Sequence, residues 1–305
     1  MKIPPISFTF LALVLSLFAP SSKADTVPLG TAAAFSVLAG SAVTNTGTSV
    51  IMTGDVGVWP GTAVSGFPPG IVTAPGTIHD QDAVAQQAQV DLTTAYNSLA
   101  GASVTKVLTG TNLGGLTLTP GVYFFATSAQ LTGTLTLNAE GQANATWVFQ
   151  IGSTLTTASN SVVSIINPGS NDGLFWQVGS SATLGTTTDF EGNIVALTSI
   201  TLDAGATDEC GRVLALNGAV TLGSNTISTA CGDVAGEGNS GGLSGVSSTS
   251  GGTGGTGGTG GTGGTGGSGG GGGTTSVPEP ATFGLLLAGL LPLGLLTLRK
   301  LQASC

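Results

Sequence analysis

Short runs of alternating apolar and polar residues recur through the middle of the chain. Residues 116–119 (LTLT), 134–137 (TLTL) and 200–202 (ITL) place Leu or Ile at every second position, with Thr between them. A period of two is typical of a β-strand with one buried face, because successive side chains point to opposite sides. We therefore expect strands that turn Leu and Ile inward and Thr outward.

These strand runs belong to a repeated unit. One copy is VFQIGSTL at 148–155 and another is FWQVGSSATL at 175–184. Thr-Leu pairs return at 183, 201 and 221, and the loop 167–173 fills the longer gap that follows residue 154. Such a unit cannot bury its apolar side alone and must stack on its neighbours. The repeats predict a mainly β fold, a parallel β-helix, with an outward row formed by Thr154, Thr183, Thr201 and Thr221.

One segment has a helical rather than a strand period. Residues 80–99 carry apolar side chains at Val84, Ala88, Leu92, Ala95 and Leu99, and Gly101 follows them. Two aspartates near the start suit the positive end of a helix dipole. We expect one amphipathic helix that lies along the solenoid and covers an apolar flank.

The two ends of the chain differ in composition from the middle. Residues 1–24 have the charge, apolar run and small residues of a secretory signal peptide, with a membrane anchor as the alternative. Residues 25–234 form the predicted domain, and residues 235–276 are a linker rich in Gly, Thr and Ser. Residues 277–305 contain an apolar run from 281 to 298, for which a permanent membrane tail is an alternative.

The last segment reads VPEP at 277–280, then the apolar run, then Arg299 and Lys300. This order resembles the PEP-CTERM sorting signal of Gram-negative bacteria. The resemblance implies that an exosortase-type processing enzyme recognises residues 277–300 and removes the tail together with Cys305. It also implies a transient inner-membrane anchor and a final extracellular or cell-surface location.

Charge and catalytic chemistry are scarce. The 305 residues include six Lys plus Arg, 15 Asp plus Glu and one His, for a net charge of −9, which argues against nucleic acid as a partner. We expect His79 to be a loop or cap residue. A polysaccharide lyase on a β-helix usually needs clustered carboxylates with Lys or Arg, and Lys106 and Arg212 are too few to support that activity. The acidic runs at 189–191 and 208–209 lack the spacing of a calcium loop. We expect no catalytic residue, no metal and no cofactor.

Two cysteines stand about one predicted coil apart, at Cys210 and Cys231. Adjacent coils bring equivalent Cα atoms to a separation of roughly 4.4 to 6.8 Å, which is the range that a disulfide requires. With export to an oxidising compartment, we predict a crosslink between them that closes the last coil.

The domain also resembles a known family, the ice-binding proteins that carry the DUF3494 domain. The likeness is carried by residues 29–32, 35–47, 53–57, 66–70, 116–123, 175–184 and 217–222. It implies a discontinuous right-handed parallel β-helix with one long α-helix alongside. It further implies that the partner is an ice crystal surface, adsorbed through a flat face rich in Thr, Ser, Asn and Ala, and that ice growth and recrystallisation are inhibited.

The resemblance points to a candidate contact surface. The family's ice face often carries Thr, then Ala or Gly, then any residue, then Thr or Asn, and residues 157–160 (TASN) fit this pattern. The favoured set of candidate ice-contacting residues comprises Thr46, Thr48, Thr157, Asn160, Thr186, Thr188, Ala206, Thr207, Ser224, Asn225 and Thr226. The alternative is the outward row Thr154, Thr183, Thr201 and Thr221. An extracellular adhesin or biofilm-matrix protein on the same scaffold is the competing function.

Overall fold

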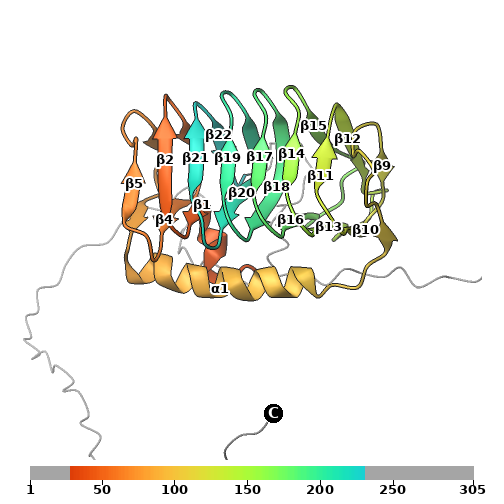
Figure 1. Cartoon of the computed structure of the whole chain (residues 1–305), viewed down its shortest axis with the longest axis horizontal. Helices are drawn as coiled ribbons and strands as arrows, with labels where there is room; N and C mark the ends of the chain where they lie inside the picture. Colours follow the sequence, from red (N-terminus) through yellow and green to blue (C-terminus); the bar gives the residue numbers. More distant parts are fainter. Residues whose placement is uncertain (1–27, 231–305) are drawn as a thin grey trace, which may run out of the picture. The chain divides into compact units, whose positions relative to one another are not determined.

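The computed structural model describes residues 28–230, which form a solenoid of stacked coils (Figure 1). Neighbouring strands within its sheets run parallel. The strands form a parallel β-helix, as the repeats predict, and they line three faces. A short 3-10 helix, Gly30–Ala34, precedes the first strand.

The first face, here called the helix face, lies against the α-helix. Its strands in spatial order are β8 (Lys106–Val107), β10 (Gly121–Phe125), β13 (Thr146–Ile151), β16 (Gly173–Val178), β18 (Asp189–Ala196), β20 (Thr207–Ala215), β1 (Phe35–Ala39), β4 (Asp55–Val58) and β7 (Ile78–Asp80). The long strands β18 and β20 bend at a bulge between Glu191 and Asn193, so their first halves belong to another face.

The second face, the threonine face, is a sheet of seven strands. They are β11 (Ala129–Leu131), β14 (Leu155–Thr157), β17 (Ala182–Leu184), β19 (Ile200–Leu202), β21 (Val220–Gly223), β2 (Ala42–Thr46) and β5 (Ala63–Ser65). The third face contains β9 (Thr117–Leu118), β12 (Thr134–Asn138), β15 (Val162–Ile166), the first halves of β18 and β20, β22 (Thr226–Ser228), β3 (Val50–Ile51) and β6 (Ile71–Val72).

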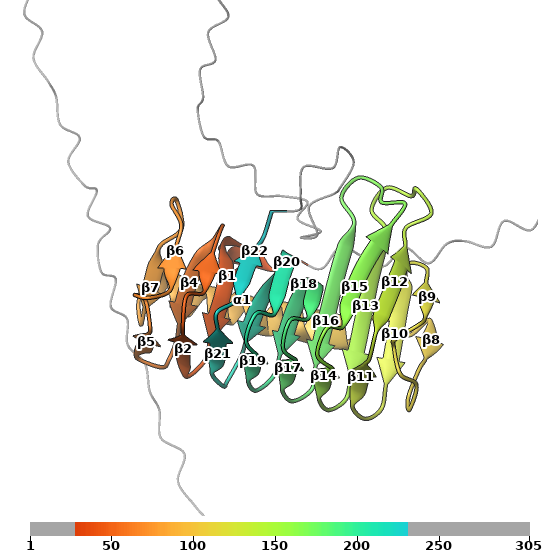
Figure 2. The same cartoon turned by 90° about the horizontal axis from the view of Figure 1, so that it is seen from above.

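The order of the coils in space differs from their order in the chain. The last coil stacks on the first, with Val213 of β20 in register with Val37 of β1. From β1 the chain moves toward one end of the solenoid, and helix α1 (Ala83–Ala100) carries it to the opposite end (Figures 1 and 2). The later coils then return to the first. The solenoid is therefore a discontinuous β-helix, as the family resemblance implies.

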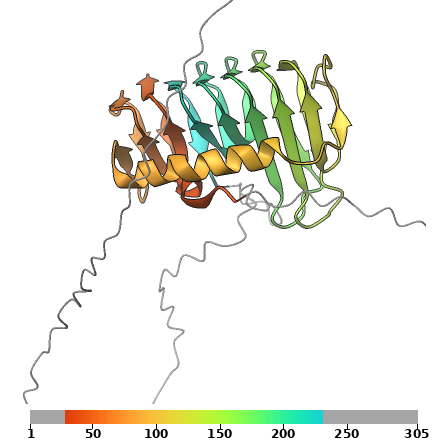
Figure 3. The same cartoon turned by 60° about the horizontal axis from the view of Figure 1, so that its bottom comes forward.

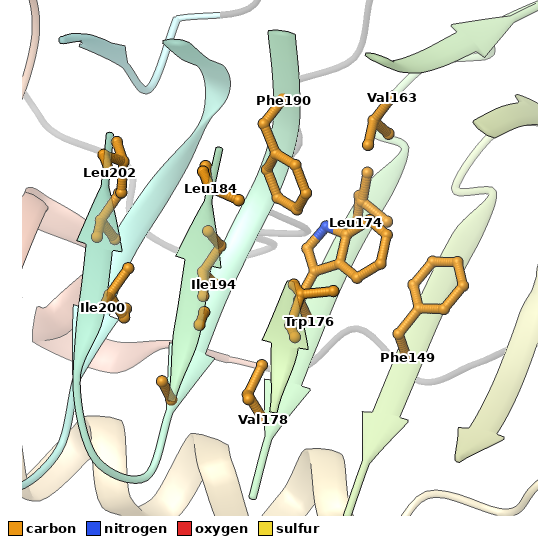
Figure 4. Close-up of a cluster of buried hydrophobic side chains, with 14 of the residues drawn as sticks. Phe149, Val163, Leu174, Trp176, Val178, Leu184, Phe190, Ile194, Ile200 and Leu202 are labelled. Carbon is orange, nitrogen blue, oxygen red and sulfur yellow. The ribbon is translucent and has the colours of Figure 1, made fainter. Parts of the chain in front are cut away.

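Inward side chains at equivalent positions of successive coils form the core. Phe149 and Trp176 stack with ring centroids 4.1 Å apart, and Trp176 lies 5.0 Å from Phe190. Aliphatic residues such as Leu184 and Ile200 continue the core along the axis (Figure 4). Both hydrophobic clusters lie between Leu29 and Ile227. The described segment therefore has its own hydrophobic core, which is the property that defines a domain.

The helix lies along the helix face, as predicted (Figure 3). Its start differs from the prediction, because Asp80 belongs to β7 and the side chain of Asp82 caps the helix by accepting from the amides of Val84 and Ala85. Val84 is 47% exposed, and Ala85 takes the buried position instead. A small side chain there lets the helix approach the sheet closely.

Two buried glutamines fasten the helix to the coils beneath it. Nε2 of Gln150 donates to the carbonyl oxygens of Leu99 and Ala102, both at 2.8 Å. Nε2 of Gln89 donates to the carbonyl oxygen of Ala215 at 3.1 Å. The first contact adds a side-chain donor at the helix end, where the last carbonyl groups lack i+4 partners within the helix.

Several predictions concern residues outside the described segment. These are the signal peptide (1–24), the linker (235–276), the sorting segment (277–305) and Cys231. The crosslink from Cys210 to Cys231 therefore stays a prediction. Within residues 28–230, no helix has the length and apolar character needed to cross a bilayer.

Candidate functional site

One continuous row of outward side chains, six of which carry a hydroxyl group, crosses the middle of the threonine face. Strand register places its members directly beside one another. In spatial order this central row consists of Gln130, Thr156, Thr183, Thr201, Thr221, Thr44 and Ser65. Steps of about 4.8 Å between strands make the row roughly 29 Å long. The β-helix thus holds a rigid, regular array of hydroxyl and methyl groups.

The predicted outward row is right for three of its four residues. Thr183, Thr201 and Thr221 are in register, but the partner of Thr183 in the next coil is Thr156 rather than Thr154. The prediction rests on aligning the Thr-Leu pairs of successive coils. In this coil, the inward position that follows the outward threonine holds Thr157 instead of leucine. Because Thr157 is buried where the other coils have leucine, the Thr-Leu pattern gives the wrong register for this coil.

Thr154 instead begins a second outward row, two positions earlier along the strands. Its Oγ1 donates to Oγ of Ser128 at 2.9 Å. Backbone hydrogen bonds link Thr154, Ser181 and Ser199 to the strands beside them. The flanking row comprises Ser128, Thr154, Ser181, Ser199, Ala219, Ala42 and Ala63. It widens the surface with small residues.

Neither row contains a charged side chain. Figure 1 looks onto this face, and in Figure 2 its strands follow one another along one edge of the solenoid. Asp203, which is exposed, directly follows β19 and lies outside both rows. The threonine face therefore offers hydroxyl and methyl groups without the strongly hydrated ions that disorder nearby water.

Four residues of the favoured candidate set cannot touch an outside surface. Thr157, Thr188, Ala206 and Asn225 are each at most 3% exposed. Oγ1 of Thr157 lies 2.8 Å from Oγ1 of Thr188, and Nδ2 of Asn225 donates to the carbonyl oxygens of Asp203 and Ala206. These side chains line the inside of the corner between the threonine face and the third face. Their polar groups satisfy turn backbone that would otherwise be buried without partners.

The other members of the favoured set are divided between two places. Exposed side chains at the rim of the threonine face are Thr46, Thr48, Asn160, Thr186 and Ser224. Thr207 and Thr226 lie half-buried on the third face, where Oγ1 of Thr207 donates to Asp189 at 3.1 Å. The favoured set therefore does not form one surface. Its exposed rim adjoins the central row, to which Thr46 is linked through β2.

The third face differs in character. Glu191 and Glu209 are in register on adjacent strands, next to Asp189. Met52 and Ile71, at the other side of this face, are exposed apolar residues. Charged and bulky side chains thus interrupt any regular array there.

The ionisable groups considered for chemistry serve structural contacts. His79 belongs to β7 rather than to a loop, and it contacts the helix cap, because its Nδ1 lies 2.6 Å from Oδ2 of Asp82. Buried Arg212 donates from Nη1 to Asn193 and from Nε to the carbonyl of Ala33, and its burial lowers the pKa of the guanidinium to about 10. Burial also raises the pKa of the Asp208 carboxyl well above its ordinary value. In the described segment, no three His, Cys, Asp or Glu side chains are grouped to hold a metal ion.

Known proteins share this sequence and this architecture. Residues 37–228 match the family described as Ice-binding-like. An ice-binding protein of Nostoc sp. (strain HG1) is 59% identical over 223 residues, covering 72% of this chain and 81% of that protein.

Two crystal structures of ice-binding proteins have the same fold. One, from an Antarctic biological consortium, is 45% identical with a TM-score of 0.62 and covers 74% of this chain and 96% of its own. The other, from the Antarctic ascomycete Antarctomyces psychrotrophicus, is 41% identical with a TM-score of 0.63 and covers 68% of this chain and 99% of its own. On this evidence, the chain belongs to the ice-binding-like family.

Proposed function

We propose that this protein binds ice through the threonine face and thereby inhibits ice growth and recrystallisation. The observation that carries the proposal is the unbroken register from Thr156 through Thr44. Family membership and the ice-binding relatives support the same function.

The chemistry of the face suits ice rather than a dissolved ligand. Threonine carries a hydroxyl and a methyl group on a side chain with a stiff χ1 angle, so its position is fixed before binding. The strand spacing of about 4.8 Å is close to a repeat of the ice lattice, and many weak contacts can then form together. The coils beneath hold the array rigid, which reduces the entropy lost on adsorption.

The rows and the rim have different roles in this proposal. The central and flanking rows make the contact surface, and the rim residues Thr46 and Thr186 extend it at one side. The buried corner residues Thr157 and Asn225 hold the turns in place beneath that rim. The function requires no catalytic residue and no cofactor.

The direct test is partitioning into a growing ice front. The fragment 25–248 contains the whole described solenoid and should be enriched in slowly grown ice relative to the remaining liquid. A recrystallisation assay at micromolar concentration should show smaller ice grains than buffer does. Exclusion of the fragment from ice, combined with binding to an exopolysaccharide, would contradict the proposal and favour an adhesin or matrix protein.

Export is the second part of the proposal. Residues 1–24 would direct secretion, and residues 277–300 would be recognised by an exosortase-type enzyme. Intact-mass measurement of the protein from its native source should then give an N-terminus at Asp25 and a chain without the tail. A mature chain that retains residues 281–298 would contradict the sorting step.

A further inference from the structure

We propose that this protein self-associates head to tail, with the β7 edge of one copy pairing with the β8 edge of a second copy. Both strands belong to the helix face, and each pairs with one neighbour in the described segment, β7 with β4 and β8 with β10. They are the two end strands of the helix face in the described segment. A second copy shifted along the solenoid axis therefore meets the first with the strand direction already correct.

Apolar side chains are exposed at both ends. Ile78 of β7 is 43% exposed, and Val107 of β8 is 62% exposed. Exposed β-branched residues on an edge strand with unpaired backbone groups favour pairing with another strand. Prolines stand beside the other strands at the first end, at Pro60, Pro69 and Pro75, whereas the three residues of β7 include none. Because proline lacks an amide donor, β7 is the strand at that end best able to extend the ladder.

The charges of the two ends are complementary. Lys106 on β8 is the one exposed basic side chain among residues 28–230, since Arg212 is buried. The first end carries Asp80, exposed on β7, with Asp82 and Asp55 nearby. In a chain so poor in charge, one cation at one end and carboxylates at the other favour contact between unlike ends over contact between like ends.

The register of the helix face fixes which residues would meet. Ile78 and Lys106 occupy the same position along their strands, as the ladder through Val56, Val37 and Val213 shows. Continued without a shift, the ladder places Lys106 of one copy opposite Ile78 of the next. The long lysine side chain then reaches diagonally to Asp80, two positions further along the strand.

This contact joins different surfaces and does not close on itself, so it generates open chains of copies. Successive copies along one axis present their threonine faces on the same side. Self-association would thus lengthen the proposed ice-contacting surface, although it does not depend on that function.

The test is the mass of the protein in solution against concentration, measured by sedimentation velocity at low ionic strength. The edge strands are short, so we expect a weak contact, of the class that buries less than about 1,200 Å². The fragment 25–248 and the full chain should both rise above the monomer mass as concentration increases, and added salt should reverse the rise. A monomer at every concentration would overturn the proposal. The proposal would also be overturned if the fragment associates and the full chain does not. Another part of the chain would then cover the β7 or the β8 edge.

Charge-reversal variants provide the specific control. Lys106→Glu and Asp80→Lys should each remain monomeric alone, because the facing charges are then alike. An equimolar mixture of the two should associate, since every contact between unlike variants restores an opposite pair, and the double variant should associate by itself. Recovery in the mixture also shows that both variants are folded. Association of either single variant at the wild-type level would overturn the proposal, as would a mixture that stays monomeric.

Discussion

Thr44 on β2 and Thr221 on β21 lie opposite each other in register, although one belongs to the first coil of the chain and the other to the last. Their pairing joins two separate stretches of the central row into one. The contact surface therefore depends on the docking of the last coil onto the first. Loss of the pairing between β2 and β21 would divide the central row into two parts, even if the coils on each side remained folded.

The buried corner of the threonine face should contribute to stability. Oγ1 of Thr157 lies 2.8 Å from Oγ1 of Thr188 and accepts from the amide of Gly185. Thr157→Val removes the hydroxyl and leaves that buried amide without a partner, at a cost of about 1–3 kcal/mol. We expect thermal unfolding to show a Tm lower by about 3 °C or more. Thr156→Val, at the exposed neighbouring position, is the control and should leave the Tm nearly unchanged. An equal Tm for the wild type and Thr157→Val would contradict the role of the corner.

Docking of the helix should depend on Gln150. Replacement by leucine removes the donor to the carbonyl oxygens of Leu99 and Ala102 and leaves both without that partner. Hydrogen exchange should become faster in the last turn of α1, and stability should fall by about 1–3 kcal/mol. Gln86→Leu, on the exposed side of the same helix, is the matched control. Unchanged protection of the last turn from hydrogen exchange in Gln150→Leu would show that Gln150 does not hold this end of the helix.

The buried carboxyl of Asp208 predicts a pH effect on stability. Burial, together with the charge of Glu191, raises its pKa above the ordinary value of 3.8, and Arg212 opposes the rise only in part. The folded state then keeps a proton that the unfolded state releases, so stability falls as pH rises above about 3.8. Asp208→Asn cannot titrate. We therefore expect the Tm of the variant minus that of the wild type to be larger at pH 7 than at pH 3. The same difference at both pH values would refute the raised pKa.

A disulfide between Cys210 and Cys231 remains a prediction with a simple test. The fragment 25–248 contains these two cysteines. After purification under oxidising conditions, it should take up no alkylating reagent until it is reduced and two equivalents afterwards, as measured by intact mass. Reduction should lower stability by about 3 kcal/mol for a loop of this size. Uptake of two equivalents before reduction would show that both thiols are free.

Local patterns in the sequence predict the helix and the strands of the repeated coils. Alternation of Leu with Thr is a local signal, and so is the helical spacing from Ala88 to Leu99. The coil register was harder, because Thr157 occupies an inward position that leucine fills in other coils. A buried threonine cannot be distinguished from an exposed one by the local sequence pattern. Only the fold shows that Thr157 and Thr188 point into the corner and Thr201 points outward.

The central claim is that the threonine face contacts ice, and thermal hysteresis of two matched variants tests it most directly. Thr201→Tyr places a bulky ring in the middle of the central row, between Thr183 and Thr221. Thr136→Tyr makes the same change on the third face, where Thr136 lies between Thr117 and Ser164. With both variants folded, we predict that Thr201→Tyr loses most of the wild-type hysteresis and Thr136→Tyr retains it. Full hysteresis in Thr201→Tyr, with loss in Thr136→Tyr, would contradict the account.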